Sequence, residues 1–405
     1  MAGNRKYITK AVLLVSLVSL FTDVASEMLY PVMPVYLRSI GFSVLLIGIL
    51  EGIAEATAGL SKGYFGHLSD TWQKRVPFIR SGYALSALSK PMMALFAYPL
   101  WIFFARTLDR FGKGIRTSAR DALLSDATTP EHKGKVFGFH RAMDTVGAAI
   151  GPLLALIYLH FYPGQYRMMF ILAFLPGLVA IALTFYLKDQ SRIPKTNDSS
   201  SETKKHVGFF AYLKYWTRAE PAFRYLVGGL LVFTLFNSSD AFLLLALKEQ
   251  HLSDTTMIGV YVFYNLVYAG FSYPVGILAD KIGLKTMLIA GLFLFAIVYT
   301  LMGFAVSLLM FGILFFLYGL YAASTEGISK ALLSNLAGKE ETATAIGFYN
   351  SMASVCMLVS SSLAGIIWYT SGPKTLFILS GSAVFVVVVY LVIVFRYKLP
   401  RKKSG

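Results

Sequence analysis

Twelve apolar stretches, each about 20 residues long, occupy most of the chain and limit what it can fold into. A helix of that length crosses the hydrocarbon core of a bilayer, at 1.5 Å per residue. Lipid offers the backbone no hydrogen-bond partner, so repeated stretches of this kind are predicted to be helices. The chain is therefore predicted to be an all-α polytopic membrane protein. The stretches cover residues 11–37, 44–65, 77–98, 100–123, 135–159, 166–187, 223–247, 255–276, 286–306, 308–335, 342–369 and 374–396.

The distribution of charge agrees with this interpretation. Only 14% of the residues are charged, against roughly 25% in soluble proteins. The net charge of +16 would also suit a nucleic-acid-binding protein, but no soluble segment carries a basic stripe with interleaved aromatic residues. With both termini inside, the outward loops hold four basic residues, Arg38, Arg167, Lys248 and Lys374, whereas the inward segments hold twenty. This asymmetry predicts a multi-pass protein of the cytoplasmic (inner) membrane with both termini in the cytoplasm.

We expect neither internal disulfide bonds nor a cleavable signal peptide. The one cysteine, Cys356, lies in an apolar stretch and excludes an internal disulfide framework. The first apolar stretch is longer than the apolar region of a cleavable signal peptide, so we interpret it as the first spanning helix.

A short charged loop occurs twice, between the second and third stretches of each half of the chain. Residues 276–285 read GILADKIGLK, and a degenerate copy, GHLSD followed by Lys74 and Arg75, begins 210 residues earlier at Gly66. Two further matches recur at an offset of 209 residues, 122–126 with 331–335 and 138–143 with 347–352. The repeats predict that a six-helix unit has been duplicated.

The paired loops resemble the characteristic loop of the major facilitator superfamily, and the resemblance covers essentially the whole chain. It implies two pseudo-symmetric six-helix bundles that work by alternating access, with a substrate site between them near the bilayer midplane. Gly66 and Gly276 are expected to let a neighbouring helix approach closely. Asp70 and Asp280 are expected to face the positive N-terminal end of a helix of the opposite half and to act in gating. In the first copy, residues 71–73 (TWQ) depart from the family's pattern after the acid.

The predicted domains are an N-terminal bundle (1–188), a linker (189–222) and a C-terminal bundle with a basic tail (223–405). Residues 189–208 are polar and rich in Ser and Lys, as in a flexible connector. Residues 209–216 mix aromatic and basic side chains, which predicts a short amphipathic helix in the lipid headgroup region.

Ionisable residues inside the apolar stretches are the main functional candidates, because a charge at membrane depth is costly and normally faces a cavity or a partner. Asp23 and Glu27 lie four residues apart in the first stretch, Glu55 lies in the second and Asp144 in the fifth. These four carboxylates are the candidates for proton coupling, Asp144 foremost. His140 is a weaker candidate for a part in proton transfer.

The fourth stretch carries a basic face. Arg106, Arg110 and Lys113 follow one another at helical spacing. They either bind an anionic substrate group or pair with buried acids and hold the helices together. Lys113 is expected to pair with Asp109, whereas Arg116 and Arg120 are expected to extend to the membrane surface. Asn237, in a polar break of the seventh stretch, and Glu326, in the tenth, complete the candidate substrate site.

Gly147, Gly151 and Pro152 in the fifth stretch form a Gly-x-x-x-Gly-Pro pattern. It resembles the antiporter motif of the drug/proton exporters in this superfamily. The other interpretation is an ordinary packing face of small residues.

The function predicted is secondary transport, foremost proton-coupled export (antiport) of a small organic solute. The alternative is proton-coupled uptake or exchange of an organic anion. A receptor or a lipid-modifying enzyme would leave the two-half symmetry unexplained. The sequence has no phosphate-binding loop and no clustered metal ligands, so we expect neither enzyme activity, nor a cofactor, nor a metal. The expected partners are a small molecule (an anion in the alternative), protons and the bilayer. No nucleic acid is expected, and the protein is expected to be a monomer.

Overall fold

The computed structural model describes residues 7–30, 32–189, 208–250, 252 and 254–397, and these residues form helices and no strands. The N-terminal half contains α1 (Lys10–Glu27), α2 (Met33–Ser39), α3 (Val44–Thr71), α4 (Val76–Leu95), α5 (Pro99–Asp126), η1 (Pro130–His132), α6 (Lys133–Phe161) and α7 (Tyr166–Thr184). The remainder contains η2 (Ala211–Lys214), α8 (Tyr215–Arg218), α9 (Pro221–Phe236), α10 (Ala241–Glu249), α11 (Asp254–Ile282), α12 (Leu284–Met302), α13 (Leu308–Leu336) and α14 (Thr342–Tyr397).

These elements confirm the twelve predicted spans. The first span consists of α1 and α2, and the seventh consists of α9 and α10. The break in the seventh span falls at the predicted polar residues 237–240, which follow the end of α9 at Phe236. The last two spans are joined as α14, where Gly372 adopts a φ of 82° between them. A positive φ suits glycine, which has no Cβ to clash with the backbone.

Seven segments of the described chain are long and apolar enough, by length and composition alone, to cross a membrane. Helix α5 is not among them, because eight charged residues lie along its length. Its place inside the bundle explains how it carries them: Arg106, Asp109, Arg116, Arg120 and Asp121 are all buried against protein. The membrane assignment of this helix therefore follows from its position and not from its hydropathy.

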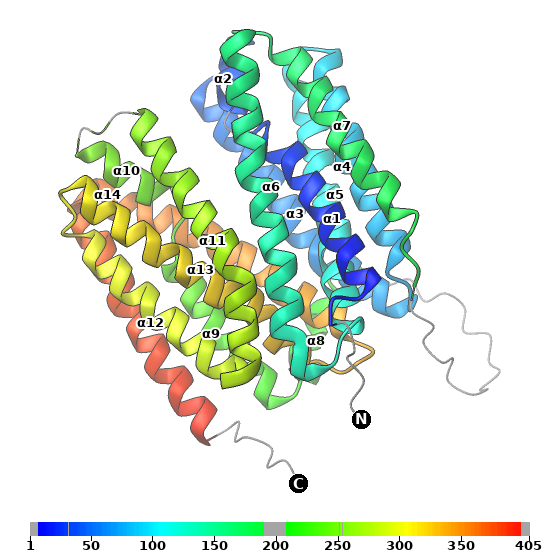
Figure 1. The fold of residues 1–405 in the computed structure, drawn as a ribbon, viewed down its shortest axis with the longest axis vertical. Helices are drawn as coiled ribbons and strands as arrows, with labels where there is room; N and C mark the ends of the chain where they lie inside the picture. Colours follow the sequence, from blue (N-terminus) through cyan, green and yellow to red (C-terminus); the bar gives the residue numbers. More distant parts are fainter. Residues whose placement is uncertain (1–6, 31, 190–207, 251, 253, 398–405) are drawn as a thin grey trace.

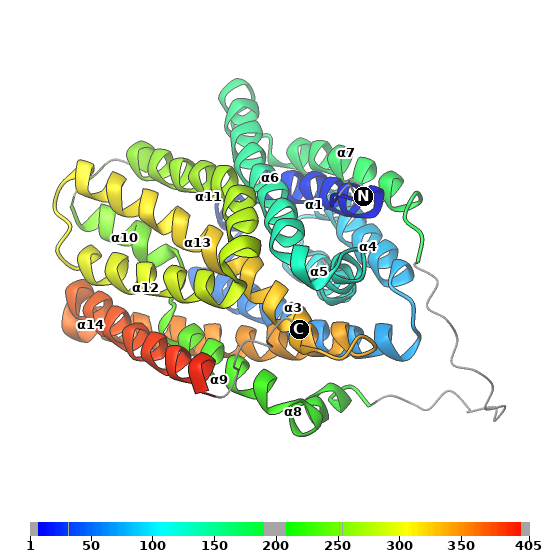
Figure 2. The same cartoon turned by 60° about the horizontal axis from the view of Figure 1, so that its bottom comes forward.

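The spans form two bundles that meet along two helix pairs (Figures 1 and 2). Helix α6 of the first bundle packs along α11 of the second, and α3 packs along α14. The described ends of the chain lie at the same end of the molecule, where the bundles converge (Figure 1). At the other end the bundles diverge. We call the end with the termini the closed end.

Glycines allow the backbones to touch at the closed end. A Cβ on Gly66 would collide with the carbonyl oxygen of Ala343, and a Cβ on Gly276 would collide with that of Gly134. Ala343 and Gly134 are themselves 209 residues apart, so the two crossings are copies of one contact. The expectation that these loop glycines permit close approach is confirmed.

The segment before the seventh span differs from its prediction. The linker residues 190–207 lie outside the described part of the chain, and the predicted amphipathic helix is two short turns, η2 and α8. Tyr212 is buried and its hydroxyl lies 2.8 Å from Ser351 Oγ, while Trp216 stacks on Phe348. Phe209 stacks on Tyr64 of α3. The aromatic side chains thus pack on the α3–α14 crossing and do not form a purely lipid-facing surface.

Tyrosine and phenylalanine rings fill the interior of the second bundle. Phe295 stacks on Tyr299 with ring centroids 4.0 Å apart, and Tyr321 meets Phe295 edge-on at 4.9 Å. Tyr318 lies among the same rings, and its hydroxyl donates to Asp240 at 2.7 Å. The ring cluster fixes the wall of this bundle that faces the first bundle.

We predict that Gly276→Ala opens the closed end, because the new methyl group meets a backbone oxygen of α6 that cannot move independently. The state in which this end is closed is expected to lose about 1–3 kcal/mol of stability. In a Cys356→Ser background, nitroxide labels at positions 74 and 281 should report a longer distance between the bundles. Gly270→Ala is the matched control on the same helix, since a Cβ there meets nothing within 4 Å. Identical distance distributions for both variants would contradict the prediction.

Candidate functional site

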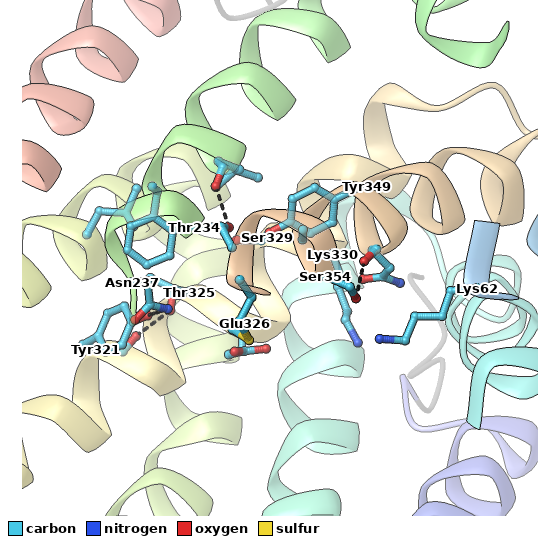
Figure 3. A pocket seen from close by; sticks show the side chains of 16 residues that line it. Lys62, Thr234, Asn237, Tyr321, Thr325, Glu326, Ser329, Lys330, Tyr349 and Ser354 are labelled. Carbon is cyan, nitrogen blue, oxygen red and sulfur yellow. Dashed lines mark hydrogen bonds between the residues drawn. The ribbon is translucent and has the colours of Figure 1, made fainter. Parts of the chain in front are cut away.

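Two adjoining cavities lie between the bundles. The larger, of about 370 Å³, is bounded by α1, α3, α5 and α6 on one side and by α11, α13 and α14 on the other. The smaller, of about 230 Å³, lies mainly within the second bundle. Both are lined by Lys62, Glu326, Lys330 and Asn350, which therefore mark their junction. Figure 3 shows the smaller cavity, with Lys62 and Lys330 extending toward one another from opposite sides.

Six of the nine residues predicted for proton coupling or substrate binding line these cavities. They are Asp23, Glu27, Lys113, Asn237, Glu326 and Asp144. Glu55, Arg106 and Arg110 are not among the lining residues of either cavity. Of the predicted basic face of the fourth span, Lys113 lines the cavity, whereas Arg106 and Arg110 do not.

Asp144 lies at the centre of a network of buried charge. Its Oδ2 is 3.7 Å from His140 Nε2, 3.8 Å from Arg141 Nη1 and 3.9 Å from Arg120 Nη1. These contacts are at the long end of ion-pair distances, and the other carboxylate oxygen, Oδ1, has no hydrogen-bond partner in the described chain. Asp144 is 5% exposed, so the charge of its carboxylate is balanced by Arg141 and Arg120, and by His140 only when that imidazole is protonated.

Arg141 extends this network to the second bundle. Its Nε donates a hydrogen bond to the hydroxyl of Tyr268 on α11, and its Nη2 lies 3.8 Å from a carboxylate oxygen of Glu326 on α13. Its guanidinium also lies over the Tyr268 ring, 5.1 Å from the centroid. One arginine thus links Asp144 to an acid and a phenol of the opposite half.

Arg106 belongs to a separate cluster beside the cavity. Asp109 Oδ1 accepts a hydrogen bond from Lys90 Nζ at 2.6 Å, and Oδ2 lies 3.6 Å from Arg106 Nη1. The expectation that Asp109 pairs with Lys113 was wrong. The spacing along α5 allowed that pair, but Lys90 on α4 occupies the carboxylate while Lys113 points to the cavity.

Arg110 forms an ion pair with Glu55 of α3 at 3.2 Å. This contact joins the second and fourth spans of the same bundle. Two of the three basic residues predicted to bind substrate are therefore engaged by acids of their own half.

Arg116 and Arg120 were predicted to extend to the membrane surface, and this was wrong. Both are buried and line the larger cavity. The Arg116 guanidinium lies 4.4 Å from the Tyr83 ring centroid, and Arg120 lies 3.0 Å from Asp121. Buried partners hold them inside the bundle more strongly than the surface could attract them.

Asp70 and Asp280, the acids of the two repeated loops, contact helix N-termini of the opposite half, as predicted. Asp280 accepts from the backbone N–H groups of Gly134 and Lys135 at 2.8 and 3.0 Å, at the start of α6. Asp70 accepts from the backbone N–H and hydroxyl of Thr344 at 2.6 and 2.7 Å, at the start of α14. These free N–H groups carry the positive end of the helix dipole.

Other contacts join the bundles at the same end. Lys133 Nζ donates to the carbonyl of Ser334 at 3.0 Å, and Lys330 forms an ion pair with Asp121 at 2.8 Å. Asp70 also pairs with Arg75 at 2.5 Å, within its own loop.

Gly147 and Gly151 pack α6 against α1. A Cβ at Gly147 would lie 2.5 Å from the carbonyl oxygen of Leu20 and 3.1 Å from Asp23 Cβ. One at Gly151 would lie 2.7 Å from the backbone nitrogen of Met28. Pro152 lies inside α6, which continues through it. The small residues bring the two helices that carry Asp23 and Asp144 into contact.

Sequence reasoning missed Lys62, Asp121 and Asn350 as site residues. Lys62 lies inside the predicted second span and, like other charges at membrane depth, could have been singled out on that ground. Asp121 follows Arg120 near the end of the fourth span, and its partner Lys330 lies in the other half of the chain, which spacing along one helix does not show. Asn350 carries no charge, so nothing in the pattern distinguished it.

Comparisons with known proteins agree with this architecture. The family model of the Major Facilitator Superfamily matches residues 15–264 and 226–405. An uncharacterized MFS-type transporter of Methanocaldococcus jannaschii is 31% identical over 378 residues, which cover 92% of each chain. The multi-drug resistance efflux pump PmrA of Streptococcus pneumoniae is 24% identical and covers 78% of this chain and 79% of its own.

Among solved structures, the human organic anion transporter MFSD10 superposes with a TM-score of 0.78 at 18% identity, over 94% of this chain and 98% of its own. The fold and the central cavity are those of a membrane transporter. The chain belongs to the major facilitator superfamily.

We predict that Asp109→Asn lowers the free energy of unfolding by about 3–5 kcal/mol, because it leaves Lys90 and Arg106 buried beside a neutral amide. Adding Lys90→Met should restore part of the loss, since it removes one of the two cations. Thermal unfolding of the purified single and double variants measures both effects. If Asp109→Asn unfolded like the parent protein but lost ligand binding, the cluster would belong to the substrate site.

Proposed function

We propose that this protein exports a small organic solute in exchange for protons. The observation that carries the proposal is the position of Asp144. Its buried carboxylate lines the cavity and is linked through Arg141 to Glu326 and Tyr268 of the opposite half. A proton on this carboxylate would remove the charge that attracts Arg141, Arg120 and His140. Protonation would thereby change the contacts between the bundles.

The neighbouring acids of α1 support the same role. Asp23 and Glu27 line the cavity, and Gly147 allows α6 to approach α1 beside Asp23. A proton arriving at Asp144 thus has further carboxylates within one water-accessible space. Glu55, which pairs with Arg110 outside the lining, is a weaker candidate.

Export is favoured over uptake by the Gly147–Pro152 pattern and by the relationship to PmrA, which is named as a multi-drug efflux pump. In the proposed cycle, Asp70 and Asp280 hold the closed end while the cavity is open toward the other end. Breaking these contacts would let the bundles rock and expose the cavity to the side of the termini, which we propose is the cytoplasm.

The second candidate function is uptake or exchange of an organic anion. The larger cavity is lined by six basic side chains and five carboxylates. An excess of cations at membrane depth is costly unless a negative charge balances it, which favours an anionic substrate in either direction of transport.

We predict that Asp144→Asn abolishes accumulation driven by a pH gradient in proteoliposomes but preserves solute counterflow. Asparagine keeps the size and hydrogen-bonding shape of the side chain but cannot carry a proton. Glu220→Gln, which neutralises an exposed acid before α9, is the control and should behave like the parent.

Two outcomes would argue against this assignment. Unchanged pH-driven accumulation by the Asp144→Asn variant would exclude Asp144 as the proton carrier and leave Asp23, Glu27 or Glu55. Net solute transport by the parent protein without any proton movement, and unaffected by the pH gradient, would exclude proton coupling.

A further inference from the structure

Lys62 is a cation without an ion-pair partner among the residues that the structure describes. It projects from α3 into the junction of the two cavities, and its ammonium has no hydrogen bond or ion pair with any residue of the described chain. The charges around it are those of Lys113, Lys330 and Arg110 and one acid, Glu55. Glu55 is already engaged by Arg110. The surroundings of Lys62 therefore have a positive balance.

Lys330 faces Lys62 from the opposite half (Figure 3). Its ammonium lies 2.8 Å from Asp121, but Asp121 is shared with Arg120 at 3.0 Å. One carboxylate thus serves two cations. The nearby Glu326 lies beside Arg141. The acids of this region are committed, and the lysine pair (Lys62 and Lys330) remains under-compensated.

The charge of Lys113 is better balanced. Asp23, Glu27 and Glu55 all lie near enough to act on it, together with the repulsive Arg110. For this reason the lysine pair, and not Lys113, is the place where the cavity lacks negative charge.

Two amides at the same place also lack partners. Asn350 Nδ2 is buried at the junction without an acceptor in the described chain. Deeper in the smaller cavity, Asn237 donates to the Tyr321 hydroxyl at 3.4 Å, while its buried Oδ1 accepts no hydrogen bond from described residues. A donor thus stands at the lysine pair, and an acceptor stands at the far end of the smaller cavity. Buried polar atoms of this kind usually have a partner, so these point to a bound molecule or to water.

The smaller cavity combines aromatic and apolar side chains with hydroxyl groups. Phe233, Tyr321, Tyr349 and Leu230 line it together with the hydroxyl-bearing Thr234, Thr325, Ser329 and Ser354, and its charged lining residues are Lys62, Lys330 and Glu326. A ligand held at the lysine pair would therefore place an uncharged body against these rings.

We propose that the transported solute is a small organic anion. Its carboxylate, or a similar acidic group, lies between Lys62 and Lys330 with Asn350 as a further donor, and its aromatic or apolar body occupies the smaller cavity. A hydroxyl or amine on that body would donate to Asn237. The proposal rests on the transport function above and specifies its substrate.

An anion at this position has a mechanical consequence. Lys62 and Lys330 belong to opposite bundles, and their like charges repel one another when the bundles close. An anion between them replaces the repulsion by two attractions, so closure around a loaded site is favoured over closure around an empty one.

The test uses the purified full-length protein with hydroxybenzoate, hydroxyphenylacetate, naphthoate and indole-3-acetate. Each acid is compared with its primary amide, which has the same shape without the charge. Calorimetry should show binding of at least one acid and much weaker binding of its amide. Lys62→Gln should weaken that acid about 10–100-fold, the contribution of a hydrogen bond to a charged group.

Matched variants separate charge from folding. Lys62→Gln removes no partner of a protein acid, so its melting temperature without ligand should equal that of the parent. Lys62→Arg should retain most of the affinity. Lys214→Gln, which removes the same charge from an exposed position before α8, should bind like the parent. Lys330→Gln should also weaken binding but is expected to lose stability, because it removes a partner of Asp121.

Several results would overturn the proposal. Equal binding of an acid and its amide would show that the charge of the ligand is not recognised. Unchanged affinity in Lys62→Gln would show that the lysine pair does not bind the acid. Equal binding of inorganic sulfate would leave an anion site without a place for the organic body. Failure of every acid to bind the parent would exclude this substrate class.

These failures are distinguishable from failure of the proposed transport mode. Proton-coupled export of a neutral or cationic compound would overturn the anion site and leave the transport mode intact. Transport of an acid without proton movement would overturn the proton-coupled transport mode and leave the anion site intact.

Discussion

The charge carried by α5 is the constraint on which the arrangement of its neighbours depends. A charged side chain at membrane depth is stable only with a partner or in a water-filled cavity. Four of the helices around it supply partners: α4 brings Lys90 to Asp109, α3 brings Glu55 to Arg110, α6 brings Asp144 toward Arg120, and α13 brings Lys330 to Asp121. A helix too polar to cross lipid alone thereby fixes the positions of four others. Lys113 and Arg116 of α5, which belong to none of these pairs, line the larger cavity.

The sequence predicted the spans because the physical limits are strict. Membrane thickness sets the length of each helix, and backbone hydrogen bonding excludes the alternatives. The break before α10 was predictable because polar residues interrupt an apolar helix. The close contacts of Gly66 and Gly276 were predictable because only glycine permits such an approach.

The partners of the buried charges were not predictable in the same way. Periodicity along one helix tells which side chains share a face, but it does not tell which helix that face meets. Asp109 could pair with Lys113 by spacing, yet Lys90 from another helix is its partner. Arg116 looked close to the membrane surface, yet the ring of Tyr83 holds it inside. Such contacts depend on how α4 and α5 are placed side by side, which a single sequence does not state.

The contacts at the closed end and the cavity differ in symmetry. The contacts of Gly66 and Gly276 occur as copies, whereas the charges that line the larger cavity lie mostly in the first bundle and the tyrosines in the second. One ion pair joins equivalent positions of the two repeats. Asp121 and Lys330 are 209 residues apart in the sequence and form an ion pair with one another. Equivalent residues beside a pseudo-two-fold axis necessarily face each other, so equal charges there would repel. The repeats carry opposite charges instead, and the bundles attract at the axis. Lys330 also lines both cavities, so the ion pair between the repeats includes a residue of the cavity wall. The Asp121–Lys330 contact thus connects the lining of the cavities to the contacts between the bundles, as Arg141 does through Glu326 and Tyr268.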